Sequence, residues 1–378
     1  MKVKLGTVCQ IVSGSTPKTT IPEYWDGEIK WITPAEIAED TYIINDSIRK
    51  ITELGVQKTG LTAFPKGTVI LSSRAPIGKV AIAGCEMYCN QGFKNLICSS
   101  NLNNRYLYWF LKRKKDFLNT LGRGATFKEI SKQIVSNIEI ELPSMDVQEQ
   151  IADKFDKLQS IITHLRTQLK KLDLLIKGRF VEMFGNPETN PMSWRESTIG
   201  KECYYIKDGP HKSLKDIGKE NGGHPFISVR NIVNGYIDFD SAKYISDDDF
   251  NDAIKKCHPE KGDILYSKGG TTGIAKLIDV DEPFANWVHV AVLKFDKSIL
   301  NGIFFEKMLN LDYCYQQSQL LTKGIANRDL VLSAMAQINI YVPPLDLQTQ
   351  FADFVQQVDK SRFITLKENK ESEFYDKL

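Results

Sequence analysis

The segment NIEIELPSMDVQEQIAD at residues 137–153 returns as QINIYVPPLDLQTQFAD at residues 337–353, without a gap. The match continues upstream, and the offset between the copies changes slowly, as small loop insertions would cause. Further matched positions are Leu121 with Leu321, Gly124 with Gly324, Gly78 with Gly273, Ser72 with Ser267, Lys66-Gly67 with Lys261-Gly262, and Trp31-Ile32 with Phe226-Ile227. A repeat of about half the chain is far longer than a solenoid period and indicates a duplicated domain.

Each copy has the same order of predicted elements. Short β-like runs at 68–71 and 79–82 precede a helix predicted at about 104–118 by its apolar spacing. The last strand, 138–142, alternates isoleucine and leucine with glutamate, which is typical of a strand with one buried face. Its twin is 338–342, and both strands end at a proline, which cannot donate to a ladder. Each half therefore predicts a mixed α/β domain.

A long helix is predicted after each proline, with Asp146 and Asp346 as N-caps. In the first helix, apolar residues recur at alternating intervals of four and three, which predicts a coiled-coil seam. The seam positions are Ile151, Phe155, Leu158, Ile162, Leu165, Leu169, Leu172 and Ile176. Gly185 and Pro187 are predicted to end this helix. The second helix continues the pattern with Phe351, Val355 and Val358, and Arg362 then interrupts it.

Such a seam must be covered by another helix, and the twin helix is the obvious partner. Two duplicated halves joined in this way form an object with a pseudo-twofold axis, as B-DNA does. A helix of about 34 residues is roughly 50 Å long, comparable with about 15 base pairs of DNA. The duplication itself does not select DNA, because a symmetric scaffold for proteins or sugars would have the same pattern.

The composition sets broad limits. The chain has 378 residues, 42% hydrophobic and 25% charged, and a net charge of +2. A protein that held DNA by charge alone would be more basic, so positive residues must be locally placed, or a partner must share the binding. We expect a cytoplasmic protein, because no apolar run reaches bilayer length and no signal peptide is evident. The seven cysteines are scattered and predict buried, reduced thiols and no metal site.

Several segments together resemble one family, the specificity subunits of type I restriction–modification systems. The strand end Ile-Glu-Leu-Pro at 140–143 leads into Gln-Glu-Gln-Ile-Ala at 148–152, with twins at 341–344 and 348–352. Met183-Phe184-Gly185-Asn186-Pro187 closes the central helix. Leu71-Ser72-Ser73-Arg74-Ala75-Pro76-Ile77-Gly78 and Asn90-Gln91-Gly92-Phe93-Lys94 are also characteristic. The resemblance covers nearly the whole length.

The resemblance implies an α+β fold of two target recognition domains, related by a pseudo-twofold and joined by two long helices in an antiparallel coiled coil. The expected parts are domain 1 at 1–145, a central spacer at 146–184, a linker at 185–192, domain 2 at 193–345 and a C-terminal spacer at 346–378. Each domain would read one part of a split, asymmetric sequence in double-stranded DNA. Two methyltransferase subunits, and motor–nuclease subunits for restriction, would join it. S-adenosylmethionine, ATP and Mg²⁺ would bind to those partners, and this chain would hold no cofactor. The interrupted seam of the second helix departs from the family pattern.

Catalytic motifs were sought and none is complete. Pro343-Pro344 lacks the Asn or Asp and the aromatic residue of an amino-methyltransferase pocket. Gly122-Arg123-Gly124 lacks the third glycine of a cofactor loop, and Gly78-Lys79 is followed by Val80 where a P-loop needs a hydroxyl. The five histidines show no nucleophile or metal-ligand partner. A non-catalytic subunit is therefore predicted, with an unrecognised enzyme and a protein scaffold as the alternatives.

Base edges are read by donors and acceptors on exposed loops, and phosphates by Lys, Arg and backbone amides. The loops that carry such residues differ in sequence between the halves, while the surrounding strands agree. The predicted DNA-binding residues of the first half are Ser72, Ser73, Arg74, Lys79, Gln91, Lys94, Arg123 and Lys128. Those of the second half are Lys268, Thr271, Thr272, Trp287, His289, Lys323, Asn327 and Arg328. Simple drift of loops after duplication explains each single difference equally well.

Overall fold

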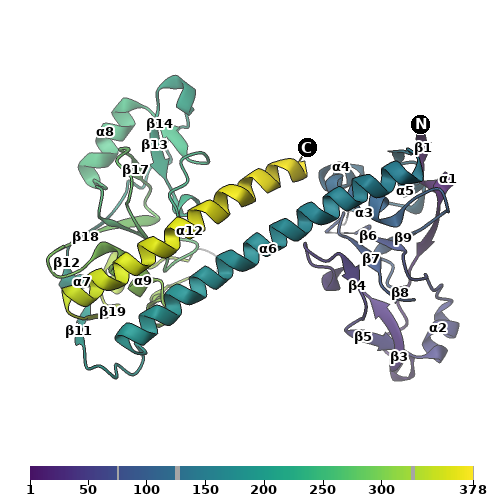
Figure 1. Cartoon of the computed structure of the whole chain (residues 1–378), viewed down its shortest axis with the longest axis horizontal. Coiled ribbons are helices and arrows are strands. Elements are labelled where there is room, and N and C mark those ends of the chain that lie inside the picture. Colours follow the sequence, from purple (N-terminus) through teal and green to yellow (C-terminus); the bar gives the residue numbers. More distant parts are fainter. Residues whose placement is uncertain (75, 124–127, 325–327, 378) are drawn as a thin grey trace. The chain divides into compact units, whose positions relative to one another are not determined.

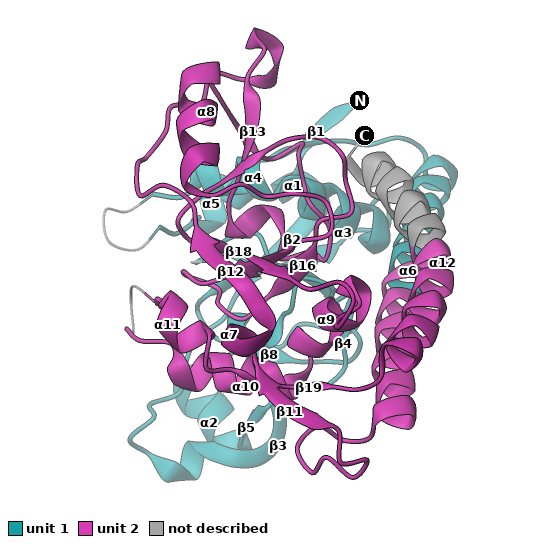
Figure 2. Ribbon diagram, turned by 90° about the vertical axis from the view of Figure 1, so that its left-hand side faces the viewer, with its two compact units in different colours: residues 1–164, 369–378 teal, residues 165–368 magenta. Residues whose placement is uncertain are grey.

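The computed structural model describes residues 1–74, 76–123, 128–324 and 328–377, with the side chains of the last helix described as far as Arg362. The chain divides into two compact units, residues 1–164 with 369–378 and residues 165–368 (Figure 2). No helix in the described residues is both long and apolar enough to span a membrane.

The first unit contains three sheets and several short helices (Figure 1). Strands β2, β9, β6, β7 and β4 form one sheet in that order, β5, β3 and β8 form a second, and β1 pairs with β10. The elements are β1 Lys2–Lys4, α1 Leu5–Val8, β2 Cys9–Ser13, β3 Trp25–Ile32, β4 Ile43–Ile44, β5 Arg49–Ile51, α2 Glu53–Thr59, β6 Val69–Ser72, β7 Val80–Ala83, β8 Tyr88–Cys89, β9 Phe93–Cys98, α3 Asn104–Arg113, α4 Lys115–Leu121, α5 Lys132–Ser136 and β10 Glu139–Glu141. Short 3₁₀ turns lie at Pro22–Tyr24 and Pro34–Glu36.

The second unit repeats this plan. Strands β12, β18, β15 and β16 form one sheet, β14, β13 and β17 form another, and β11 pairs with β19. The elements are β11 Arg195–Thr198, α7 Ile199–Glu202, β12 Cys203–Asp208, β13 His224–Ile227, β14 Lys243–Ile245, α8 Asp247–Lys256, β15 Ile264–Ser267, β16 Ala275–Leu277, β17 Ala285–Asn286, β18 Val290–Phe295, α9 Gly302–Leu309, α10 Asp312–Leu321, α11 Leu332–Met335 and β19 Asn339–Val342. The predicted duplication is therefore confirmed in the strand order, as is the mixed helix and sheet content of each half.

The strands fall where the sequence predicts them, and one helix differs. The predicted single helix at 104–118 consists of α3 and α4, which meet at Lys114. Lys114 has φ −98° and ψ 15°, outside the helical range, so the axis breaks there. The break allows Leu107 and Leu111 of α3 and Leu118 of α4 all to be buried in the same apolar core.

Two long helices follow the repeated strand ends, α6 at Met145–Phe184 and α12 at Leu345–Lys377 (Figure 1). Both begin one residue before the predicted caps, so the prediction of Asp146 and Asp346 as N-caps was wrong. The backbone N–H of Gln148 donates to the Ser144 carbonyl at 3.0 Å, and the backbone N–H of Gln348 donates to the Pro344 carbonyl at 3.2 Å. The two aspartates therefore lie in the first turn, where their charge still favours the helix dipole.

A buried glutamine fixes the start of each long helix to its own domain. The Gln148 side chain accepts from the Asn103 amide at 2.9 Å and donates to the carbonyls of Asn101 and Pro143. Gln348 makes the same three bonds, to Asn301, Ile299 and Pro343. Both side chains are fully buried, so each bond satisfies a polar group that water cannot reach.

Within the second unit, the end of α6 packs against the beginning of α12. The Phe180 and Phe351 rings are 5.5 Å apart and perpendicular, and those of Phe184 and Phe351 are 5.6 Å apart. Further along α12, Arg362 is ion-paired with Asp173, which lies earlier in α6. The two segments therefore run in opposite directions. Gly185, with φ +79°, ends α6 as the sequence predicts.

The predicted seam residues are buried to different degrees. Ile162, Leu165, Ile176, Phe351, Val355 and Val358 are buried, and Ile151, Phe155, Leu158, Leu169 and Leu172 are half-buried. Phe180 and Phe184 extend the face beyond the predicted last position, Ile176. A coiled coil over the full length of both helices stays a prediction, because the α12 side chains after Arg362 lie outside the described residues.

Candidate nucleic-acid interface

The loop after β6 and the loop after β15 have the same backbone geometry. The Ser72 hydroxyl accepts from the Lys79 amide at 2.8 Å, and the Ser267 hydroxyl accepts from the Ile274 amide at 2.9 Å. Gly78 and Gly273 have φ of +89° and +90°, which a residue with a side chain rarely adopts. In both halves, the matched serine and glycine therefore fix the conformation of a tight loop at the end of the strand.

Each of these loops meets a second loop, which follows a parallel strand pair. The Ser73 amide donates to the Gly92 carbonyl at 2.7 Å, and the Lys268 amide to the His289 carbonyl at 2.8 Å. Asn90 and Trp287 are equivalent, because their amides donate to Ile32 and Ile227 at the carboxyl ends of β3 and β13. The predicted residues at 72–79 and 91–94 are thus brought together, and so are their twins.

In each half, a carboxylate connects a third loop to the two loops that meet there. Glu129 forms an ion pair with Arg74 at 2.9 Å and with Lys94 at 3.3 Å. Burial alone would raise the pKa of Glu129, but the hydrogen bonds from Arg74 and Lys94 bring it below its ordinary value. The corresponding carboxylate, Asp329, forms an ion pair with Lys268 at 3.0 Å. The loops that contain Arg123 and Lys323 are therefore fixed next to the other two loops.

In the first unit, the loops after β6 and β8 and the turn at Pro34–Glu36 surround a hollow of about 360 Å³. Arg74, Lys79 and Gln91 line it together with Asn90 and Thr33. The Lys79 ammonium donates to the Pro34 carbonyl at 2.9 Å, and the Thr16 hydroxyl donates to the exposed Gln91 side chain. The hollow is therefore lined by two side-chain amides and two cations, which can pair with base edges and phosphates.

The equivalent place in the second unit is a hollow of about 180 Å³ with different chemistry. Trp287, Phe226 and Leu214 form apolar walls, and Arg230 and Lys243 add positive charge. Trp287 also contacts His289, with ring centroids 4.7 Å apart. The buried Trp287 Nε1 and His289 Nδ1 have no hydrogen-bond partner within the described residues. The two hollows share three matched lining positions, Thr33 with Ser228, Ala35 with Arg230 and Asn90 with Trp287. No described residue of the loop after β15 lines the second hollow, and the two differ in what they present.

The predicted binding residues divide by exposure. Ser72, Ser73, Lys94, Lys268 and Thr272 are buried, and their recorded bonds hold the loops. Lys79, Trp287, His289 and Arg328 are half-buried, with Arg328 donating to Gln319. Arg74, Gln91, Arg123, Lys128, Thr271 and Lys323 are exposed. Asn327 lies outside the described residues. A DNA contact by each of these residues stays a prediction, and the buried ones are better suited to positioning loops than to reading bases.

Sequence reasoning missed Thr33, Asn90, Arg230 and Lys243. The match of Trp31-Ile32 with Phe226-Ile227 could have indicated the first and third, because these residues follow the matched strands directly. The position of Lys243 beside Trp287 depends on the fold and has no local signal. Lys243 starts β14, which pairs with β13 and not with the strand that precedes Trp287.

The described residues contain no group of three or more His, Cys, Asp or Glu side chains that could hold a metal ion. All seven cysteines are free thiols; five are buried as predicted, and Cys85 and Cys98 are half-buried. Burial raises the pKa of Cys89 and Cys203 to about 12 and that of Cys257 to about 11, so these thiols are poor nucleophiles.

Comparisons with known proteins agree with this arrangement. The family model described as type I restriction modification DNA specificity domain matches residues 1–173 and again 192–373. The type I restriction enzyme MjaIX specificity subunit of Methanocaldococcus jannaschii is 32% identical, over 93% of this chain and 85% of that protein. The EcoprrI specificity subunit of Escherichia coli is 20% identical, over 94% of this chain and 86% of that protein.

Solved structures with low sequence identity have the same fold. The S subunit of a type I restriction–modification system from M. genitalium has a TM-score of 0.58 at 16% identity, covering all of this chain and 93% of that one. A chain from a study of complex assembly in the type I system has a TM-score of 0.52 at 17% identity, covering all of this chain and 95% of that one. With two family matches that together cover almost the whole sequence, this chain belongs to the type I restriction–modification DNA specificity family.

Proposed function

We propose that this chain is the non-catalytic DNA specificity subunit of a type I restriction–modification complex, and that its two loop hollows read the two parts of a split target. The observation that carries the proposal is a pair of hollows beside the matched residues Asn90 and Trp287, with different linings, one with Gln91 and Arg74, the other with Arg230 and Lys243. A reader of an asymmetric sequence needs such a pair, because the same frame must distinguish different bases.

The linings suit different forms of recognition. An amide such as that of Gln91 can bond an adenine edge with two hydrogen bonds, and an arginine such as Arg74 or Arg230 can bond guanine in the same way. The apolar wall of Trp287 favours contact with a thymine methyl group or stacking on a base. The lysines would contact phosphates, which position the domain without carrying sequence information.

We further propose that methylation and cleavage are performed by partners. Two methyltransferase subunits would dock on the chain, motor–nuclease subunits would join for restriction, and S-adenosylmethionine, ATP and Mg²⁺ would bind to those subunits in the cytoplasm. The lack of a complete catalytic motif in the sequence supports the assignment of catalysis to partner subunits. The similarity to proteins named specificity subunits supports it as well.

The proposal is tested by expressing the chain with its cognate methyltransferase subunit in a host without this modification and mapping methylated sites across the genome. We expect one motif with two specified parts separated by a fixed number of unread bases. A continuous motif, or the absence of any motif, contradicts the proposal. Robust methyl transfer or cleavage by the isolated chain, given cofactor and metal, would contradict its non-catalytic part.

The number of unread bases is proposed to depend on the length of the long helices. Four residues inserted after Leu165 add about 6 Å, roughly two base pairs, to the helix. The mapped motif should gain about two unread bases while its two specified parts stay the same. A motif with an unchanged gap contradicts a spacing role for α6. Assembly of the variant with the methyltransferase is checked first, since a four-residue insertion also disturbs the seam.

A further inference from the structure

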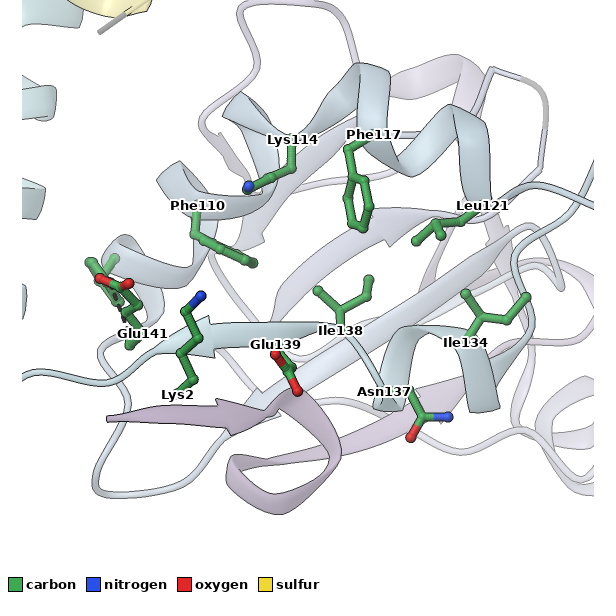
Figure 3. Close-up of a pocket in the computed structure, with 11 residues that line it drawn as sticks. Lys2, Phe110, Lys114, Phe117, Leu121, Ile134, Asn137, Ile138, Glu139 and Glu141 are labelled. Carbon is green, nitrogen blue, oxygen red and sulfur yellow. Dashed lines mark hydrogen bonds between the residues drawn. The ribbon is translucent and has the colours of Figure 1, made fainter.

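A groove of about 650 Å³ lies in the first unit, on elements that the proposed reading of DNA does not use (Figure 3). Strand β10 forms one side, and α3 and α4 form the other. Phe110, Phe117 and Leu121 line the helical side, and Ile134 and Ile138 line the opposite side. Phe117 is 47% exposed, and its ring points into this groove, whose lining also includes the charged residues Lys2, Lys114, Glu139 and Glu141. A partly exposed aromatic side chain that lines a groove with other apolar residues is available to pack against a second molecule.

The groove exposes the free edge of a strand. The Leu5 amide donates to the Ile138 carbonyl, and the Leu142 amide to the Met1 carbonyl, both at 2.8 Å. In an antiparallel pair the bonded residues alternate, so the backbone groups of Glu139 and Glu141 face away from β1. The Tyr106 hydroxyl, which comes from α3, indeed donates to the Glu141 carbonyl at 2.9 Å. Within the described residues, no group bonds to the amide or the carbonyl of Glu139 on this edge.

The duplicated half closes the same position from its own chain. Asn339 is the twin of Glu139, and the Gln317 side chain bonds both of its backbone groups, accepting from the amide at 2.8 Å and donating to the carbonyl at 3.2 Å. The Tyr313 and Tyr341 rings stack beside it, 5.6 Å apart. Gln317 and Phe117 occupy matching positions, since α10 and α4 end at the matched residues Leu321 and Leu121. A phenylalanine has no side-chain amide to make these two bonds. The strand edge at Glu139 therefore stays open, whereas the edge at Asn339 is closed.

We propose that this groove binds an extended segment of a methyltransferase subunit, which adds a strand to the free edge of β10. The backbone of the segment would bond the amide and carbonyl of Glu139 as the Gln317 amide bonds Asn339. Alternate side chains of an added strand point to one face, so every second residue of the segment should be apolar to cover Phe117 and Ile134. This inference rests on the proposed function, which brings a methyltransferase subunit to the chain.

The location of the groove favours a protein partner over DNA, because none of the predicted DNA-binding residues that the structure describes lines it. Its strand belongs to the segment that is repeated between the halves, and not to the loops that differ between them. A surface that must change with the DNA target would be a poor site for a constant partner. Because Gln317 closes the twin position, only one of the two methyltransferase subunits would be held by an added strand.

The test uses the assembled complex of the full chain with its methyltransferase subunit. The photo-crosslinking residue p-benzoylphenylalanine is placed at position 117, and in a control at position 320, where Leu320 is 87% exposed on α10. We expect position 117 to crosslink to one short methyltransferase segment with alternating apolar residues, and position 320 to give no such product. Crosslinking to a helical segment, or no methyltransferase crosslink at position 117, overturns the proposal.

A binding measurement accompanies the crosslinking. Phe117→Gln should weaken the binding of the methyltransferase subunit about tenfold, because it removes the apolar wall and supplies the closing amide found in the other half. Leu320→Gln is the matched control and should bind as the unaltered chain does. Equal affinity of all three proteins overturns the proposal. The methylated motif separates a failure of the groove proposal from a failure of the proposed function. If the complex methylates a split motif without using this groove, only the groove proposal fails. If the complex methylates no motif, the proposed function fails.

Discussion

The two units hold their long helices with opposite chemistry. In the first unit, Asp156 of α6 accepts hydrogen bonds from the Tyr42 hydroxyl at 2.7 Å and the Trp109 indole at 2.8 Å, and pairs with Arg105 at 2.7 Å. In the second unit, Phe351 of α12 packs among Phe180, Phe184 and Phe304 with no charge at its centre.

The difference shows which features the duplication fixes. The strand-end prolines and the glutamines at 148 and 348 are the same in both halves, as is the strand order except for β4, which has no counterpart in the described part of the second unit. Asp156 corresponds to Gln356, which is exposed, so the polar centre of the first junction has no counterpart in the second. The backbone frame therefore tolerates a polar or an apolar junction, and the same freedom allows the two loop hollows to diverge.

The largest effect is expected from the apolar junction. Phe351→Ala should lower the free energy of unfolding of the second unit by about 3–5 kcal/mol, since it leaves a cavity among three other rings. Denaturant unfolding followed by fluorescence and circular dichroism measures this loss. A loss below about 1 kcal/mol would contradict the role of Phe351 as the centre of this core. So small a loss would mean that the neighbouring rings close the cavity or that the site is already open to water. Phe351→Leu, which keeps most of the volume, should lose clearly less.

A smaller loss is expected from the polar junction. Asp156→Ala leaves the Tyr42 hydroxyl, the Trp109 indole and Arg105 without their common partner, and should cost about 1–3 kcal/mol. Gln356→Ala, at the matching exposed position of α12, serves as the control and should stay within about 0.5 kcal/mol. If both variants lose the same amount, the contrast between the junctions is wrong.

The smallest effect is expected in how stability depends on pH, at Glu202 beside the paired strands β11 and β19. The hydrogen bond from Arg195 lowers the pKa of Glu202, a residue whose place in the first unit is taken by the apolar Val8. A depressed pKa in the folded state stabilises the fold above the unfolded-state pKa, and this contribution is lost as pH falls through the folded-state value. Glu202→Gln should therefore flatten the acid side of the stability curve, and Val8→Ala should not change its slope. An unchanged slope in Glu202→Gln contradicts this pairing.

Much of the fold could be predicted because it depends on local patterns. The alternation at 138–142 and the four-three spacing from Ile151 to Ile176 identify a strand and a helix face directly. The continuation to Phe180 and Phe184 was missed, although both follow at intervals of four on the same face. The caps were misplaced because an aspartate in the first turn of a helix has the same local signature as a capping aspartate.

The candidate site was only partly predictable, since it depends on tertiary contacts. Lys94 and Lys268 look like exposed DNA contacts in the sequence, yet both are buried against carboxylates that lie 35 and 61 residues away. Burial of a lysine requires such a partner, and no local pattern reveals it. Arg230 and Lys243 reach the hollow beside Trp287 only because of the order of β14, β13 and β17.

The central claim, that the two hollows read different parts of one target, is tested most directly by paired variants in the methylation map. Gln91→Ala alters the first hollow and Arg230→Ala the second, and both residues are exposed, so neither change should disturb a core. Each variant should relax the sequence requirement in one part of the split motif only, and the two parts should differ. Relaxation of the same part by both variants, or of neither part by either one, would contradict the account.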